Sequence, residues 1–262
     1  FSGCELLSEI ELPDSLISIG SCAFKGCKSL KTINLPNSLK SIGSEAFTVC
    51  TNLKSITFPP SATSLYEGLF NQCIGLEQII LPPSLNTISN SLFCQCTSLK
   101  KIIIPKTVTC FGNNSFEGCI KLQQITIPSS VTSIGDLCFA SCKSLRQITI
   151  PSSVTSIGDL CFASCKSLRQ ITIPSSVTSI GNKCFLECPS LTEITINSLM
   201  IQIGDKAFTQ CSSLKNIYIH SSIHKFGSKI FSNCQSLTKI SIPFSVTIIE
   251  ANIFEYCTNL KE

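Results

Sequence analysis

The sequence has little charge, no tryptophan and no long apolar run. Charged residues make up 14% of its 262 residues and hydrophobic residues 43%, and the formal net charge is +4. This balance excludes an intrinsically disordered chain and gives no reason to expect a nucleic-acid partner. The absence of a run of about 18 apolar residues excludes a membrane-spanning helix within this sequence.

Histidine is also scarce, and this narrows the chemistry that we expect. The two histidines, His220 and His224, lie in one stretch, and we interpret them as exposed side chains rather than as a metal site. Serine is abundant, but no histidine and carboxylate accompany it as in a catalytic triad, and no glycine-rich phosphate loop occurs. The sequence therefore predicts neither an enzyme nor a protein with a metal ion or cofactor.

What the sequence does contain is one unit that repeats without insertion or deletion. Residues 124–158 recur unchanged, 23 positions later, as residues 147–181. At the same interval a phenylalanine recurs along the chain, followed three positions later by cysteine and after three more by leucine. The phenylalanines are Phe1, Phe24, Phe47, Phe70, Phe93, Phe116, Phe139, Phe162, Phe185, Phe208, Phe231 and Phe254. A fixed period of this length is the signature of a solenoid.

Each unit contains one short segment that is typical of a β-strand with one buried face. An isoleucine is followed two positions later by Leu, Ile or Phe in most units, and this alternation predicts the strand. Proline follows it in nine units and ends it, because proline lacks the N–H group of a continued ladder. Farther on, eight of eleven units have a glycine, which we expect at a turn with a positive φ. A turn or one loop of 3₁₀ helix is expected before the next phenylalanine.

The units predict a single continuous domain over residues 1–262, made of eleven units of 23 residues and a partial one. One unit cannot fold alone. About six buried apolar side chains contribute roughly 9–18 kcal/mol, whereas ordering the backbone costs about 1–2 kcal/mol per residue. Stacking must supply the rest, with strands pairing in parallel. Since the chain starts and stops within units, we expect flanking sequence in the natural protein.

The spacing C-x-x-L-x-x-I-x-I-P-x-x-V-x-x-I-G-x-x-x-F closely resembles the leucine-rich repeats of the BspA type, also called the Treponema pallidum type, over the whole chain. The resemblance implies a horseshoe-like repeat solenoid with a parallel β-sheet on its concave face and short strands, turns or 3₁₀ segments on its convex side. It also implies a class of cell-surface proteins of bacteria and parasitic protists that are linked with adhesion to host matrix or other cells. The polar outward positions fit a protist.

The outward side chains of the predicted strands are the candidate ligand-binding surface. The position after the leucine is cationic in six of the eleven complete units, as Lys31, Lys54, Lys100, Arg146, Arg169 and Lys215. This column could attract sulfated glycans, acidic proteins or phosphates. The alternative interpretation is a solvated face that keeps the protein soluble.

Two neighbouring outward columns complete this surface. One contains Gln124, Gln147 and Gln170, whose side chains could form hydrogen-bonded ladders between strands and do nothing else. In the other, threonine is interrupted by Ile80, Ile103 and Tyr218. Exposed apolar or aromatic residues at the centre of such a face are better contact candidates than the threonines around them, although they could also be incidental surface.

Inward positions are expected to be structural. In the two most regular units these are Phe139, Cys142, Leu145 and Ile148, and Phe162, Cys165, Leu168 and Ile171. Free cysteine behaves as a small, slightly polar, buried residue, so we interpret the cysteine column as packing. Cys138, Cys161 and Cys184 form a second column in successive units, where a disulfide is conceivable if the Cα atoms come within about 7 Å.

The leading hypothesis is a non-catalytic domain of a cell-surface adhesin that binds a protein or glycan, such as host matrix or another cell surface, through its concave strands. The first alternative is an intracellular scaffold for a protein partner, since many unpaired cysteines are easier to keep reduced in the cytosol. The second is an enzyme whose catalytic domain lies outside these repeats.

Overall fold

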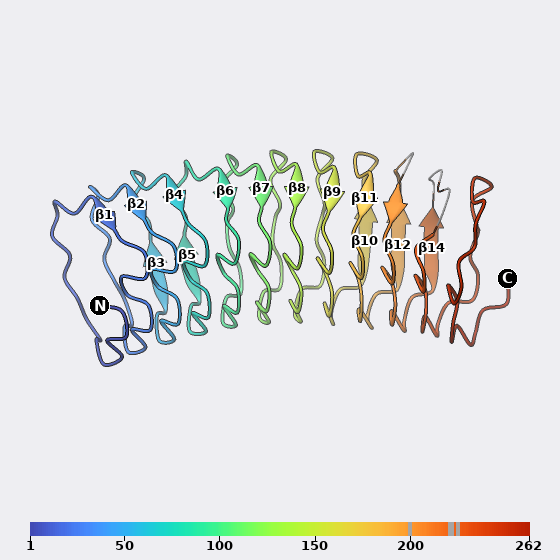
Figure 1. The fold of residues 1–262 in the computed structure, drawn as a ribbon, viewed down its shortest axis with the longest axis horizontal. Helices are drawn as coiled ribbons and strands as arrows, with labels where there is room; N and C mark the ends of the chain where they lie inside the picture. Colours follow the sequence, from blue (N-terminus) through green and yellow to red (C-terminus); the bar gives the residue numbers. More distant parts are fainter. Residues whose placement is uncertain (199–200, 220–222, 224–225) are drawn as a thin grey trace.

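A computed structural model describes residues 1–198, 201–219, 223 and 226–262. The chain forms a gently bowed row of coils, one for each repeat unit, and the two termini lie at opposite ends of the row (Figure 1). The predicted parallel solenoid of 23-residue coils is therefore confirmed. The described residues form no helix, and accordingly none that is long and apolar enough to cross a membrane.

Each coil can contribute a strand to one or both of two rows (Figure 1). The first row contains two-residue strands that end in a buried apolar side chain: β1 (Ser18–Ile19), β2 (Ser41–Ile42), β4 (Ser64–Leu65), β6 (Thr87–Ile88), β7 (Cys110–Phe111), β8 (Ser133–Ile134), β9 (Ser156–Ile157), β11 (Ser179–Ile180) and β13 (Gln202–Ile203). These strands form two sheets, β1-β2-β4 and β6-β7-β8-β9-β11-β13, within which neighbours pair in parallel at the repeat interval, as Ser156 with Ser179. Equivalent residues of successive coils thus lie side by side.

The second row lies at the predicted strand segment and is interrupted. It contains β3 (Ser55–Thr57) paired with β5 (Gln78–Ile80), and β10 (Gln170–Ile173), β12 (Glu193–Ile196) and β14 (Asn216–Ile219) in a second sheet. Between these sheets, the equivalent segments 101–104, 124–127 and 147–150 are not strands. In the described part of the chain, no main-chain hydrogen bond joins these three segments to one another.

The core is a stack of identical columns. Twelve phenylalanine rings follow one another along the row with centroids 5.3–5.8 Å apart and nearly parallel planes. Beside them lie the other inward columns, and every inward residue predicted for the two regular units is buried: Phe139, Cys142, Leu145, Ile148, Phe162, Cys165, Leu168 and Ile171. The coils are held together chiefly by burial of this apolar surface.

The cysteine column also forms hydrogen bonds between coils. The thiol of Cys165 donates to the main-chain carbonyl of Phe139 in the preceding coil at 3.2 Å, and that carbonyl also accepts the N–H of Cys142. The same thiol–carbonyl contact recurs in eleven coils at 3.0–3.3 Å. Cysteine therefore fits this column because it is small and apolar and yet has a donor.

The expectation of a positive φ at the glycine column is wrong. Positive φ values fall two residues before and two residues after each phenylalanine, on side chains as different as Leu137 (φ 56) and Ser141 (φ 59). At Gly158, a Cβ atom would lie 2.6 Å from the main-chain nitrogen of Asp136 and 2.5 Å from its Oδ1. Glycine is required there because Asp136 approaches closely in order to accept the main-chain N–H of Asp159 at 2.8 Å.

We expect Gly158→Ala to destabilise the protein by about 1–3 kcal/mol, because a main-chain atom of the neighbouring coil must move to admit the methyl group. Gly20→Ala is the matched control, since a Cβ there has nothing within 4 Å, and it should change stability by less than about 1 kcal/mol. Urea denaturation of both variants measures the difference. Equal effects would contradict the close-approach explanation.

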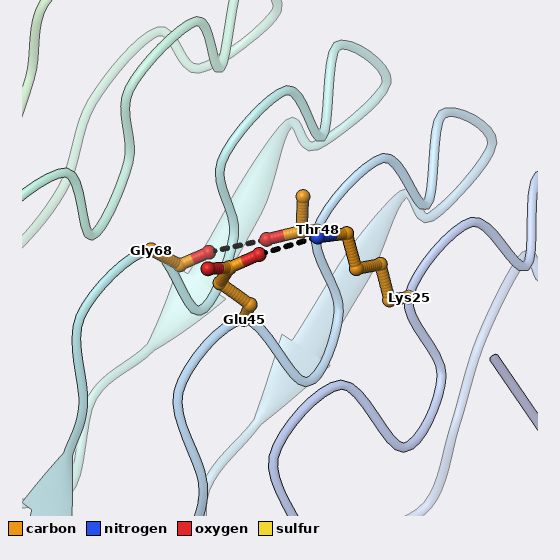
Figure 2. Close-up of polar contacts among 4 residues, drawn as sticks. All are labelled: Lys25, Glu45, Thr48 and Gly68. Atoms are coloured by element: carbon orange, nitrogen blue, oxygen red, sulfur yellow. Dashed lines mark hydrogen bonds and ion pairs between the residues drawn. The ribbon is translucent and has the colours of Figure 1, made fainter.

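Polar contacts link the turns of successive coils (Figure 2). Lys25 forms an ion pair with Glu45 at 2.6 Å, and the buried hydroxyl of Thr48 donates to the carbonyl of Gly68 at 2.7 Å. Thr209 makes the equivalent bond to the carbonyl of Lys229. These contacts link the start of one coil to the start of the next, so the turns are ordered by neighbouring coils as well as by their own sequence.

Candidate functional site

The predicted ligand-binding residues all lie on one exposed surface, which we call the strand face. It consists of the outward side chains around the second row of strands, in three columns that start at the position after each leucine. The cationic column, Lys31, Lys54, Lys100, Arg146, Arg169 and Lys215, is exposed throughout. Gln124, Gln147 and Gln170 are exposed beside it. Whether this face binds a ligand stays a prediction.

The cations of this column are not equivalent. The Nζ atom of Lys54 lies 3.5 Å from Oε1 of Glu77 in the next coil. This carboxylate partly offsets the charge of Lys54. Among the described residues, no ion pair includes the other five cations of this column. Unpaired positive charge therefore extends along the column, and Arg146 and Arg169 are its two neighbouring guanidinium groups.

A groove of about 670 Å³ brings several of the predicted residues together. Its lining consists of Gln123, Gln124, Arg146, Gln147, Arg169, Gln170 and Thr192, and we call it the arginine–glutamine groove. Guanidinium groups present a planar fork of donors that matches carboxylate and sulfate, and carboxamides both donate and accept. The groove is thus suited to bind an anion together with amide or hydroxyl groups. Gln123 and Thr192 were not predicted as contacts, although they share a column with the arginines.

Two smaller hollows adjoin the groove. One, of about 420 Å³, reaches from Lys101 and Ile103 to Gln147, and the other, of about 530 Å³, reaches from Gln147 to Glu193. The first lies along segments 101–104, 124–127 and 147–150, where the second row of strands is interrupted. These segments form no main-chain hydrogen bonds to one another within the described structure.

The predicted apolar contacts are separated along the strand face. Ile103 is 85% exposed and Ile80 is 62% exposed, and they occupy the same position in neighbouring coils. Tyr218 is 46% exposed but lies beside Thr195 at the far end of the second sheet. The two isoleucines, which we call the isoleucine pair, form a local apolar spot, whereas Tyr218 stands apart from it.

The cysteines are described as free thiols, including the three for which a disulfide was conceivable. Burial raises the pKa of Cys138 to about 12, and it raises the pKa values of Cys161 and Cys184 well above the ordinary thiol range. The thiols therefore stay protonated and poorly nucleophilic at neutral pH. No group of three potential metal ligands occurs among the residues that the structure describes, and His220 and His224 lie outside them.

Comparison with known proteins identifies the architecture. The family model for the BspA type leucine rich repeat region matches residues 1–122, 86–198 and 133–261. The chain belongs to the BspA-type leucine-rich repeat family. The crystal structure of a leucine-rich repeat protein from Bacteroides ovatus ATCC 8483 is similar over 100% of this chain and 73% of its own, with 33% identity and a TM-score of 0.90.

Other solved structures resemble this BspA-type array less closely. The T. pallidum leucine-rich repeat protein is 28% identical over 70% of this chain and 77% of its own, with a TM-score of 0.55. A leucine-rich repeat protein from Eubacterium ventriosum ATCC 27560 is 23% identical over 92% of this chain and 80% of its own, with a TM-score of 0.52, and that likeness concerns the fold alone. No match was found among curated proteins.

Proposed function

We propose that this BspA-type array is a non-catalytic binding domain of a cell-surface protein and that it recognises a protein or glycan through its strand face. The single observation that supports this most strongly is the arginine–glutamine groove, which gathers unpaired guanidinium groups and carboxamides from successive coils. These groups bind anions and amides, but they do not exchange protons near neutral pH as a general acid or base must. A binding role fits this chemistry better than a catalytic one.

The free cysteines do not count against an extracellular position. Thirteen of the 18 thiols are buried, and burial raises the pKa of thiols such as Cys142 and Cys165 well above the ordinary range. A protonated, inaccessible thiol oxidises slowly in any compartment. The argument that cysteine content favours an intracellular scaffold is therefore weakened, and the resemblance to surface proteins is the better guide.

Protease treatment of intact source cells tests the location. An antibody against the repeat should lose its signal without cell lysis, while a cytosolic marker stays intact. Full protection of the repeat would favour the intracellular scaffold instead.

The binding role is tested by charge reversal on the strand face. We expect Arg146→Glu with Arg169→Glu to reduce binding to anionic matrix proteins or sulfated glycans at least about 10-fold, because two attractive contacts become repulsive. Lys40→Glu with Lys106→Glu is the matched control, since it changes the net charge equally at exposed residues outside the groove. Surface plasmon resonance on a panel of purified matrix proteins and glycans measures both variants. Equal losses in the two variants would remove the groove from the proposal.

A further inference from the structure

Ile103 of the isoleucine pair is connected to the arginine–glutamine groove, and Ile80 occupies the same position in the coil before it. Ile103 shares its hollow with Gln124 and Gln147, and these two glutamines also line the groove that contains Arg146 and Arg169. The hollow and the groove are therefore one continuous trough across neighbouring coils. It runs along the axis of the row, across the direction of the strands.

The isoleucine pair has no evident structural purpose. The same position is occupied by Thr57, Thr126, Thr149, Thr172 and Thr195 in other coils. Threonine and isoleucine suit a strand about equally well, so the fold does not require isoleucine there. Exposing two large apolar side chains to water is unfavourable, and burying them against a partner would stabilise the complex.

The trough also has a charge preference. All seven side chains of the arginine–glutamine groove are neutral or cationic, and Lys100 and Lys101 are exposed at the end near Ile103. A nearby carboxylate, that of Glu193, lines the other adjoining hollow, beside Gln170 and on the side away from Ile103. Successive coils are about 4.8 Å apart, so the two arginines offer two guanidinium groups at that interval. The complementary ligand has anionic groups at one end and an apolar group at the other.

The coil spacing sets the length of that ligand. Arg146 and Arg169 stand two and three coils from Ile103, about 10–15 Å along the row, and their column lies three strand positions, about 10 Å, to one side of it, so the direct separation is about 14–18 Å. An extended polypeptide advances about 3.3 Å per residue, so roughly four to five residues separate an apolar side chain on the isoleucine pair from a carboxylate on the arginines. Peptide groups also match the carboxamides of Gln124, Gln147 and Gln170, which line the groove. A sulfated glycan supplies the anions but no apolar side chain.

We propose that the trough binds an extended acidic segment of a partner protein, with an apolar residue on Ile80 and Ile103 and with carboxylates on Arg146 and Arg169. This inference rests on the proposed binding function and narrows it to one class of partner. The partner segment lies along the row of coils, and its apolar residue and its acidic residues are separated by the spacing given above.

Selection of a random dodecapeptide library against the immobilised protein tests the inference directly. Enriched peptides should be acidic and should contain an apolar residue about four to five positions from an acidic one. By fluorescence anisotropy, Arg146→Gln with Arg169→Gln should raise the Kd of an enriched peptide at least about 10-fold, and Ile103→Thr should raise it about 5-fold. Lys40→Gln with Lys106→Gln, the matched control, should leave the Kd within about 2-fold.

Three outcomes would overturn the inference: no enrichment, enrichment of peptides without acidic residues, or affinities that the groove variants leave unchanged. A heparin octasaccharide that binds through Arg146 and Arg169, while no peptide does, would assign the trough to a glycan. Such a result would leave the proposed binding function intact. Failure of the unaltered protein to bind any glycan or matrix protein of the panel would count against the proposed function itself.

Discussion

The protein should unfold cooperatively between about pH 9 and 11, because its core is rich in buried thiols. Burial raises the pKa of Cys50 to about 12, and it raises the pKa values of Cys73, Cys96 and Cys119 well above the ordinary thiol range. In the unfolded chain a thiol loses its proton near pH 8.5, while the folded chain keeps it. The unfolded state therefore binds fewer protons above that pH, and the free energy of unfolding falls as the pH rises.

The expected slope is large. Each buried thiol removes about 1.4 kcal/mol of stability per pH unit, from the unfolded-state pKa up to its own raised pKa. Since a typical domain has about 5–15 kcal/mol of stability, the summed loss from the cysteine columns exceeds it within one to two pH units. Far-UV circular dichroism under reducing conditions, with urea titrations at several pH values, measures the slope. Stability that stays constant from pH 8 to about 10 would contradict buried, protonated columns.

A triple variant provides the control. Cys138, Cys161 and Cys184 occupy a column in which other coils have Ala46 and Ala207, so Cys138→Ala, Cys161→Ala and Cys184→Ala together should be tolerated. Removing three of the titrating thiols should reduce the slope by about 4 kcal/mol per pH unit. The slope is the informative quantity, because small cavities lower the stability of the variant equally at every pH. An unchanged slope would mean that these thiols are not shielded.

Phe162→Ala should cost about 3–5 kcal/mol, the usual range for a fully buried aromatic side chain. Phe162 is fully buried and stacks on Phe139 and Phe185 with centroids 5.4 and 5.3 Å away. Because each coil contacts only its neighbours, the cavity also weakens the coupling between the two halves of the array. Urea denaturation should show a lower midpoint and a less cooperative transition.

The end of the same column offers a matched comparison. Phe1 stacks on Phe24 but is 62% exposed, so Phe1→Ala should cost less than about 1 kcal/mol. Phe162→Leu keeps most of the buried volume and should lie between the two alanine variants. A loss below about 1 kcal/mol for Phe162→Ala would show that the ring stack is not the core of the solenoid.

Much of this fold follows from the repeat alone. When coils of equal length stack, residues one repeat apart lie next to each other. The interval between Phe139 and Phe162 therefore predicts the ring stack, and the interval between Cys142 and Cys165 predicts the thiol column. The sequence does not reveal why glycine occupies its column. A position with a positive φ and a position that a neighbouring main chain approaches closely both favour glycine. The positions that do have positive φ are occupied by Leu137, Ser141 and many other side chains, and therefore have no sequence signature.

The candidate site was only partly predictable. The columns of Arg146, Gln147 and Ile103 could be placed on one face from their spacing. The ion pair of Lys54 with Glu77 depends on side-chain placement. The interruption of the second row is not encoded in the repeat either, because residues 147–150 and 170–173 have the same sequence and only the second segment is a strand. Residues that repeat in every coil can be recognised as structural from the sequence. Ligand specificity is expected at the positions that differ from the repeat. A parasitic protist source stays a prediction.

The central claim is that the chain is a row of interchangeable coils, and small-angle X-ray scattering of a shortened chain tests it most directly. Deleting residues 139–184 removes two complete units. The new junction, Cys138 followed by Phe185, has the same sequence as the Cys161–Phe162 junction, so the repeat continues without a shift. The account predicts a folded protein with the same cross-section and a length reduced by about 10 Å, two coil spacings. An expanded scattering profile typical of an unfolded chain, or a length that does not change, would contradict it.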